Sequence, residues 1–429
     1  MTKLIVITPG YISHYKPIAM FLKSCGLTGD EVLVATNMEL QSIVEDDGFC
    51  FYEFQAWKNS NPGKIDMERQ LEEERRILEA SYESTYKGMV SALRFQAEHR
   101  IHDLFARLEE IETGIHQLIN TYHPRMFLSV QLCYNVTAVL EKLQVRYITY
   151  VTGNPDQLPR PDELYGYPHY PPKGIVTDVA ELKELYHCCS KVQQIATEQF
   201  YRLTGYRINN MFSVASQDMI LYNFPRMLIK HRSVQRQEYY LGASCCPYET
   251  EPQIESRLQE MRASGKPIVY VSFGTVFSVR GDVLKKIYQA LIQMDFCVVA
   301  STGVLADKYR PYLQPEWLTG DFLPQLLILK YADLLVGHGG NNSITEALAN
   351  GVPVVAFPFA SDQFFSAKSI EENGIGTICD PNHADVDEIC SKLIAALECT
   401  SKVMLVSQNI AAQEDKRRAI KKIKEMLEG

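Results

Sequence analysis

Short apolar runs alternate with longer amphipathic stretches along the first half of the chain. Such alternation of strands and helices is typical of a parallel α/β sheet. A helix is expected to open near Pro17, a favourable first-turn residue, and helices are expected across residues 64–123 and 179–204. Buried strands are expected at residues 3–7, 31–35, 49–54, 125–130, 146–151 and 218–222, with the last of these ending the first sheet.

The same pattern begins again in the second half. Apolar runs predict strands at residues 267–273, 297–301, 334–336 and 352–357. Between the halves lies a stretch with Gly242, Pro247 and Pro252, which is typical of a linker. The expected domains are therefore an N-terminal domain at residues 1–240, a linker at 241–252, a C-terminal domain at 253–405 and a final helix at 406–429 that packs back across both domains.

Two stretches of the first half leave alternatives open. Residues 64–123 are rich in charge, which favours a solvated pair of helices covering the sheet, with an acceptor-site lid as the other interpretation. Residues 154–172 are rich in proline and tyrosine. That loop either borders a binding cleft, where tyrosines stack on a ligand, or packs on its own aromatic residues.

Length and charge limit the class of protein. A chain of 429 residues predicts about two or three domains. The net charge of -9, from 43 basic and 52 acidic residues, argues against nucleic acid as the main partner. No apolar run approaches the roughly 20 residues of a membrane helix, and the four apolar residues Leu4–Ile7 are too few for a signal peptide.

The cysteines indicate a reducing compartment. There are 11 of them, an odd number, with adjacent pairs at residues 188–189 and 245–246 and no C-x-x-C. Adjacent pairs make an unlikely disulfide framework, so the sequence predicts free thiols and a cytoplasmic protein.

The turn after residues 334–336 has the form that a phosphate needs. Gly339 and Gly340 allow the backbone to approach an anion closely. A helix beginning near Ser343 would direct free N–H groups and its dipole toward that anion, and His338 can donate a further hydrogen bond. The alternative is a capping box made by Ser343 and Glu346, with the glycines serving only a tight turn.

A longer pattern favours the first interpretation. Aromatic-x-Pro-Gln at residues 322–325 precedes His-x-Gly-x-x-Ser-x-x-Glu at 338–346, Gly-Val-Pro at 351–353 and Asp-Gln at 362–363. This order resembles the donor-site signature of the family 1 nucleotide-sugar glycosyltransferases, and residues 272–275 add a second matching motif. The resemblance implies an α/β protein of the GT-B fold, with two doubly wound Rossmann-like domains facing a cleft. The N-terminal domain would bind the acceptor and the C-terminal domain the donor.

The resemblance also implies a role for each donor-site residue. Phe322 would stack on the nucleobase, although packing in the core is the alternative for this side chain. Asp362 and Gln363 would bind the sugar hydroxyls, or would merely begin a helix. The remaining implied contacts are Leu323 and Gln325 with the base and ribose, His338, Gly340, Ser343 and the turn amides of Asn341 and Asn342 with the diphosphate, Glu346 with the ribose hydroxyls, and Gly274 and Thr275 with the distal phosphate or the sugar.

His14 is the candidate general base. Residues 14–17 match the His-x-x-Pro that the family carries after its first strand, and a histidine near neutrality suits proton abstraction. A lone histidine in a loop is otherwise an ordinary surface residue. The family's aspartate at the end of a later strand, which orients this histidine, is absent, because the strand ends in Ser129-Val130-Gln131. Either another acid replaces it, or His14 acts alone on an easily ionised acceptor, or catalysis is lost.

Together these features predict an inverting glycosyltransferase that moves a hydroxylated hexose from a UDP- or dTDP-sugar to a small-molecule acceptor, as in natural-product glycosylation. No metal is expected, because Asp385-Val386-Asp387 resembles a metal-binding D-x-D but directly precedes a helical run. No cofactor is expected beyond the nucleotide-sugar co-substrate. The alternatives are a nucleotide-sugar epimerase or hydrolase, and a non-catalytic partner protein that retains the fold.

Overall fold

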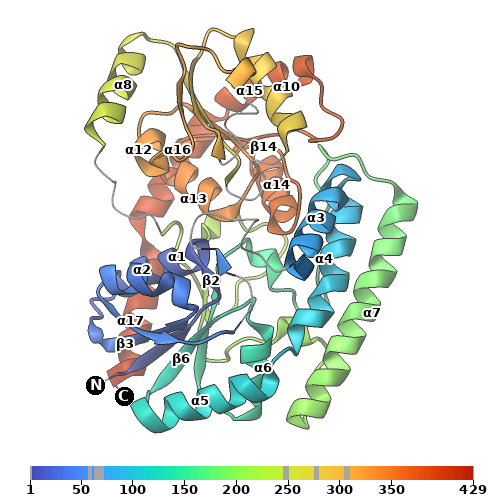
Figure 1. The fold of residues 1–429 in the computed structure, drawn as a ribbon, viewed down its shortest axis with the longest axis vertical. Coiled ribbons are helices and arrows are strands. Elements are labelled where there is room, and N and C mark those ends of the chain that lie inside the picture. Colours follow the sequence, from blue (N-terminus) through green and yellow to red (C-terminus); the bar gives the residue numbers. More distant parts are fainter. Residues whose placement is uncertain are drawn as a thin grey trace.

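Two parallel β-sheets form the centres of the two halves of the chain (Figure 1). The computed structural model describes residues 2–56, 60–61, 72–244, 251–274, 280–303 and 310–428. The first sheet has the strand order β4-β3-β1-β6-β7-β8-β9, and the second has the order β12-β11-β10-β13-β14-β15. In each sheet the chain starts near the middle and proceeds to both edges, which confirms the expected α/β class with two doubly wound halves.

The strands of the first sheet are β1 Leu4–Ile7, β3 Gly29–Thr36, β4 Phe49–Glu53, β6 Met126–Val130, β7 Tyr147–Val151, β8 Ile220–Tyr222 and β9 Glu238–Tyr240. Those of the second are β10 Ile268–Ser272, β11 Cys297–Ser301, β12 Leu318–Gly320, β13 Leu334–Gly337, β14 Val354–Ala356 and β15 Gly376–Ile378. Strands β2 Gly10–Tyr11 and β5 Ser60–Asn61 form a separate short pair.

The expectation that residues 218–222 end the first sheet was wrong, because β9 pairs with β8 beyond them. The sequence hides this strand, since Glu238 puts a charge where an apolar residue is expected. The carboxylate is nevertheless only 1% exposed. It is paired with Arg160, whose Nη1 lies 2.8 Å from Oε1, so its burial is compensated by an ion pair.

Helix α1 spans Ile12–Ser24, so it begins well before the expected start near Pro17. The proline lies inside the helix, and His14 lies in its first turn and not in a loop. A proline in a helix removes one N–H and thus a single main-chain hydrogen bond, whose carbonyl here belongs to Ser13. The other helices of this half are α2 Gln41–Asp46, α3 Glu72–Tyr86, α4 Met89–Leu104, α5 Leu108–Tyr122, α6 Tyr134–Lys142 and α7 Val179–Thr204.

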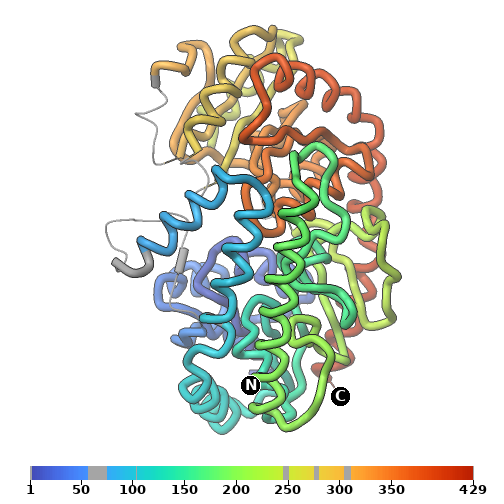
Figure 2. Tube along the Cα trace, turned by 90° about the vertical axis from the view of Figure 1, so that its right-hand side faces the viewer, coloured from blue at the N-terminus to red at the C-terminus, as the bar shows by residue number. Residues whose placement is uncertain are grey.

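The charged region contains three helices, α3, α4 and α5, where a pair was expected. Helices α3, α4 and α7 stand together along one side of the molecule and reach the second half (Figures 1 and 2). The end of α3 meets Arg280, a fully buried residue whose guanidinium lies 4.0 Å from the centre of the Tyr86 ring. The end of α3 therefore joins the two halves.

The helices of the second half are α8 Pro252–Ala263, α10 Gly281–Ile292, α12 Gln325–Leu329, α13 Asn341–Ala349, α14 Asp362–Asn373, α15 Val386–Leu397, α16 Thr400–Ala412 and α17 Glu414–Glu428. Helix α17 crosses back to the first half and ends near the N-terminus (Figure 1). Its Ala419, Ile423 and Leu427 are buried in the same core as β1. Within the described ranges, no helix is both long enough and apolar enough to cross a membrane.

Candidate functional site

The turn between β13 and α13 is the centre of the candidate site. Gly339 has a φ of +84°, a conformation that glycine adopts without strain. Helix α13 begins at Asn341, two residues before the expected start at Ser343, and its N-cap Gly340 offers no side-chain hydrogen bond. The capping-box alternative is therefore wrong, because Ser343 lies inside the helix. The carboxylate of Asp362 accepts a hydrogen bond from the N–H of Asn341, so an anionic group already lies at this helix N-terminus.

His338 is enclosed by two glycines. A Cβ added to Gly340 would lie 2.5 Å from its Nε2, and one added to Gly274 would lie 3.2 Å from its Cε1. The ring donates to the carbonyl of Ser272. Burial lowers the pKa of His338 to about 4, so the ring is neutral at pH 7 and acts as a hydrogen-bond donor without charge. Thr275, expected beside Gly274, lies outside the described residues.

Gln325 meets Ser343 and Glu346 although it comes from a separate motif. The Nε2 of Gln325 donates to Oε2 of Glu346 at 2.6 Å and to Oγ of Ser343 at 3.3 Å. Burial raises the pKa of Glu346 to about 7, while the hydrogen bond from Gln325 acts in the opposite direction. The structure thus brings a titratable carboxylate, a hydroxyl and an amide to the start of α13.

Phe322 and Leu323 occupy the loop between β12 and α12. The Phe322 side chain is 44% exposed, so the alternative that it packs in the core is wrong. Leu323 is partly buried against the core of the second half. An exposed ring on an anchored loop suits a stacking partner, and its contact with a nucleobase stays a prediction.

Asp362 and Gln363 begin α14, as the structural alternative for this pair supposed. Gln363 is only 5% exposed, and its Oε1 accepts from the N–H groups of Phe359 and Ala360 at 2.8 and 3.2 Å. Burial raises the pKa of Asp362 to about 6. The side-chain oxygen of Gln363 therefore holds the preceding loop. The binding of sugar hydroxyls by Asp362 or Gln363 stays a prediction.

His14 lies on the other side of the site, with no acidic partner among the described residues. Its Nδ1 is buried and has no hydrogen-bond partner among the residues described. Burial, and secondly the charge of Arg100, lower the pKa of His14 to about 4. Gln131, which stands where the family has its aspartate, donates instead to the Tyr134 hydroxyl and to the carbonyl of Gln157.

Arg100 was missed by the sequence analysis. It lies on α4, is 9% exposed, and donates through Nε to the Tyr165 hydroxyl at 3.1 Å. Its guanidinium lies 5.8 Å from the centre of the Tyr134 ring. No local motif marks this residue, and only the packing of α4 brings its charge near His14.

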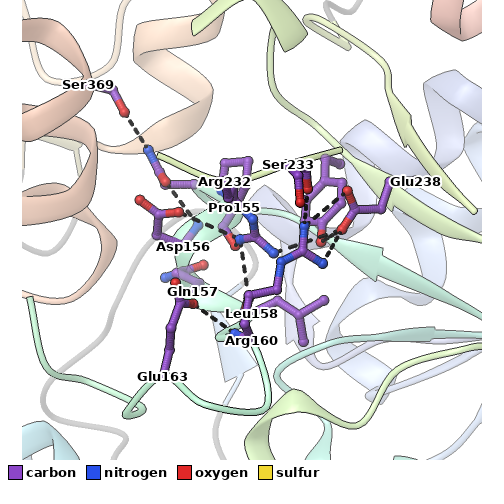
Figure 3. Close-up of polar contacts among 12 residues, drawn as sticks. Pro155, Asp156, Gln157, Leu158, Arg160, Glu163, Arg232, Ser233, Glu238 and Ser369 are labelled. Atoms are coloured by element: carbon purple, nitrogen blue, oxygen red, sulfur yellow. Dashed lines mark hydrogen bonds and ion pairs between the residues drawn. The ribbon is translucent and has the colours of Figure 1, made fainter. Parts of the chain in front are cut away.

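The loop after β7 separates the two halves and is held by buried charges (Figure 3). Arg232 donates through Nη1 to the carbonyls of Pro155 and Leu158 at 2.5 and 3.2 Å. The side chain of Gln157 in this loop lies 3.5 Å from Oγ of Ser361 in the second half. The tyrosines of this loop differ in their surroundings. Tyr165 is buried and stacks on a phenylalanine, as expected for a loop that packs on aromatic residues, whereas Tyr170 is 53% exposed, as expected for a loop that borders a cleft.

A hollow opens beside this loop, between α4 and the start of α14. It is lined by Leu93, Gln96, Leu132, Gln157, Tyr165 and Ser361. These residues come from both halves and include Tyr165, the hydrogen-bond partner of Arg100.

Comparison with solved structures defines the class of fold. The glycosyltransferase VinC in complex with dTDP has a TM-score of 0.65 at 13% identity, and each chain is covered to 100%. The spinosyn rhamnosyltransferase SpnG, complexed with spinosyn aglycone, has a TM-score of 0.63 at 15% identity over 99% of this chain and 100% of that one. At this identity the likeness establishes a GT-B fold.

Sequence comparison establishes the family. The family model described as UDP-glucoronosyl and UDP-glucosyl transferase matches residues 182–408, more than half of the chain, so the protein belongs to this family. An NDP-glycosyltransferase, YjiC, of Bacillus licheniformis is 34% identical over 119 residues, which are 28% of this chain and 30% of that protein. A demethyllactenocin mycarosyltransferase of Streptomyces fradiae is 32% identical over 127 residues, 29% and 27% of the two chains. These matches span about a third or less of the relatives' length.

Proposed function

We propose that this protein transfers a sugar from a UDP- or dTDP-sugar to a small-molecule acceptor, with inversion and without a metal ion. Membership of the family supports nucleotide-sugar chemistry. The observation that carries the proposal is the arrangement at the start of α13. There, a helix N-terminus without an N-cap side chain meets His338 and the group formed by Gln325, Ser343 and Glu346.

Each part of that arrangement suits a part of the donor. The main-chain N–H groups at the start of α13 beyond Asn341, whose own N–H is held by Asp362, would donate to the diphosphate as it leaves, which stabilises the developing charge. The neutral ring of His338 has a single N–H, which the Ser272 carbonyl accepts, so its second nitrogen would donate to the diphosphate only after the anion draws a proton onto the ring. Glu346 would accept from the ribose hydroxyls. Phe322, being exposed, would stack on the base. The solved structure of VinC is a complex with dTDP, which supports considering both uracil and thymine donors.

His14 is the proposed base, and its surroundings narrow the acceptor. A general base becomes an imidazolium during proton transfer, and the nearby charge of Arg100 disfavours that form. This free-energy cost is smallest when the acceptor ionises easily, because the acceptor then loses its proton with little help from His14. We therefore favour an acceptor with an acidic hydroxyl or a carboxyl group, in agreement with the natural-product glycosylation indicated by the name of the Streptomyces relative.

The non-catalytic partner protein remains the second candidate, and one observation favours it. The hydrogen bonds that the structure describes for Gln131 go to Tyr134 and Gln157 and do not include His14, so the residue that replaces the family's aspartate does not orient the base. An epimerase or hydrolase gains no support from any contact in the described site. The cytoplasmic location expected from the cysteines stays a prediction.

A thermal-shift panel tests the proposal, with UDP, dTDP, GDP and ADP each measured with and without magnesium. Ligand that binds the native state raises Tm by mass action. We expect UDP or dTDP to stabilise the protein independently of magnesium. If none of the four nucleotides raises Tm, the proposal is contradicted and the non-catalytic partner protein becomes the better candidate.

Phe322→Ala makes the panel specific to the proposed base contact. Its exposed ring can be removed with little effect on the folded state, and loss of stacking is worth about 1 kcal/mol, or roughly fivefold in affinity. Tyr186→Ala is the matched control, because that ring is 47% exposed and lies on α7, away from the proposed donor site. An equal loss of affinity in both variants would argue against Phe322 as the stacking residue.

A further inference from the structure

Two asparagines at the start of α13 reach across to the other half of the molecule. The Nδ2 of Asn341 donates to the carbonyls of Thr152 and Asn223 at 2.8 and 2.9 Å. The Nδ2 of Asn342 donates to the carbonyl of Ser13 at 2.8 Å. Thr152 and Asn223 directly follow β7 and β8, and Ser13 precedes His14. We call the turn between β13 and α13 the donor turn. Its side chains thus hold the edge of the first sheet at which His14 lies.

The carbonyl of Ser13 can take part because of Pro17. In an α-helix this carbonyl would accept from the N–H four residues later, and proline has none. Asn342 supplies the missing hydrogen from the other half of the molecule. The proline that interrupts α1 and the asparagine that begins α13 therefore form one matched contact.

Asn223 connects this contact to the linker. It is 1% exposed, and its Nδ2 donates to Oδ1 of Asn342 at 3.1 Å. Its Oδ1 accepts from the N–H of Ser244, in the expected linker, at 3.1 Å. One buried side chain thus joins the donor turn, the first sheet and the linker.

We propose that Asn223, Asn341 and Asn342 are positioning residues that fix α1, and with it His14, relative to the nucleotide sugar. This inference rests on the proposed function. The diphosphate would bind main-chain N–H groups at the start of α13, while side chains of the same turn hold α1. Donor and base are therefore positioned from a single turn, and a displacement of His14 by about 1 Å is enough to lower the rate strongly.

Two full-length variants test the contact from its two sides. Asn342→Ala removes the donor to Ser13, while Pro17→Ala adds an N–H within α1 that competes for the same carbonyl. UDP and dTDP affinities are measured by calorimetry, and kcat is measured as release of nucleotide from UDP-glucose and dTDP-glucose in the presence of a phenol, whose oxygen accepts the glucose. We expect Asn342→Ala to lower kcat about tenfold, the effect of one hydrogen bond, with nucleotide Kd changed less than about twofold.

Pro17→Ala separates positioning from stability. Removal of a proline from a helix interior should raise Tm, yet kcat should fall in the same direction as in Asn342→Ala. Asn382→Ala is the matched control, because its Nδ2 also crosses between the halves, to the carbonyl of Thr85 at 3.0 Å, but meets α3 and not α1. It is expected to leave kcat unchanged.

The outcomes are distinct. Unchanged kcat in Asn342→Ala, with nucleotide still bound, would overturn the positioning role and leave the proposed function standing. A parallel fall of kcat, affinity and Tm in that variant would show a merely structural contact and would also overturn it. A wild-type protein that binds neither UDP nor dTDP would overturn the proposed function itself, and the positioning role with it.

Discussion

The carboxyl edges of the two sheets are built in different ways. At the second sheet, Gln325, Ser343 and Glu346 come from neighbouring stretches and meet directly at the start of α13. At the first sheet, His14 on α1 is influenced by Arg100 on α4, a residue with no motif of its own. The comparison teaches that the proposed donor side is assembled from local turns, whereas the electrostatics of the proposed base depend on how distant helices pack.

Removal of the His14 side chain should have the largest effect on kcat and should distinguish the carboxyl edges of the two sheets. His14→Ala is expected to lower kcat about 100- to 10,000-fold, the usual contribution of a general base. Nucleotide affinity should stay unchanged, because the proposed donor contacts lie on the second half. Parallel measurement of kcat and of nucleotide Kd checks this, and an active His14→Ala variant would mean that the first edge supplies another base.

The pH profile sharpens the same comparison. The pKa of His14 is lowered from 6.5 to about 4, so the limb of kcat/KM due to His14 should lie near pH 4. It should lie below the limbs due to Asp362 and Glu346, whose pKa values are raised to about 6 and about 7. Arg100→Gln should move the His14 limb upward, but not fully to 6.5, because burial is the larger cause of the shift. An acid limb near 6.5 that persists in both Glu346→Gln and Asp362→Asn would show that His14 is solvated or paired with an acid in solution.

Gly340→Ala should damage only the second edge. The new Cβ would lie 2.5 Å from Nε2 of His338 and must displace the ring. Loss of a hydrogen bond to a charged diphosphate costs about 2 kcal/mol, or roughly 30-fold in nucleotide affinity. Calorimetry with UDP or dTDP checks this. His338→Ala provides the comparison, since a matching loss in both variants would locate the effect at the ring.

Glu346→Gln should have the smallest effect, measured as stability without ligand. Burial raises the pKa of Glu346 from 4.5 to about 7. The raised value favours the folded state at low pH, and this stability is lost as the pH rises from 4.5 through 7. Wild type and Glu346→Gln should therefore have similar Tm values at pH 4.5, and the variant should be more stable at pH 8.

The control for that series is Glu79→Gln, at an exposed position on α3. Its Tm difference from the wild type should not change between pH 4.5 and pH 8. A difference that is constant with pH in Glu346→Gln as well would mean that Glu346 is ionised in both folded and unfolded states.

The sequence by itself determined the class of fold and the residues of the donor turn. Apolar strands and glycine turns are set by short-range geometry, so β13, the glycines at 339 and 340 and the start of α14 follow from neighbouring residues. Where a charge is buried the local pattern fails, and β9 was missed because Glu238 is compensated by Arg160 from a distant loop. Helix α1 was placed too late because Pro17 suggested a first turn, whereas its missing hydrogen bond is replaced by Asn342.

Only the tertiary structure decided what surrounds His14. Its burial, the charge of Arg100 and the contacts of Gln131 all depend on the packing of α1, α4 and the loop after β7. The reason is physical: a hydrogen-bonded turn is specified over a few residues, but electrostatic interactions act between any groups that the fold brings close, whatever their separation along the chain.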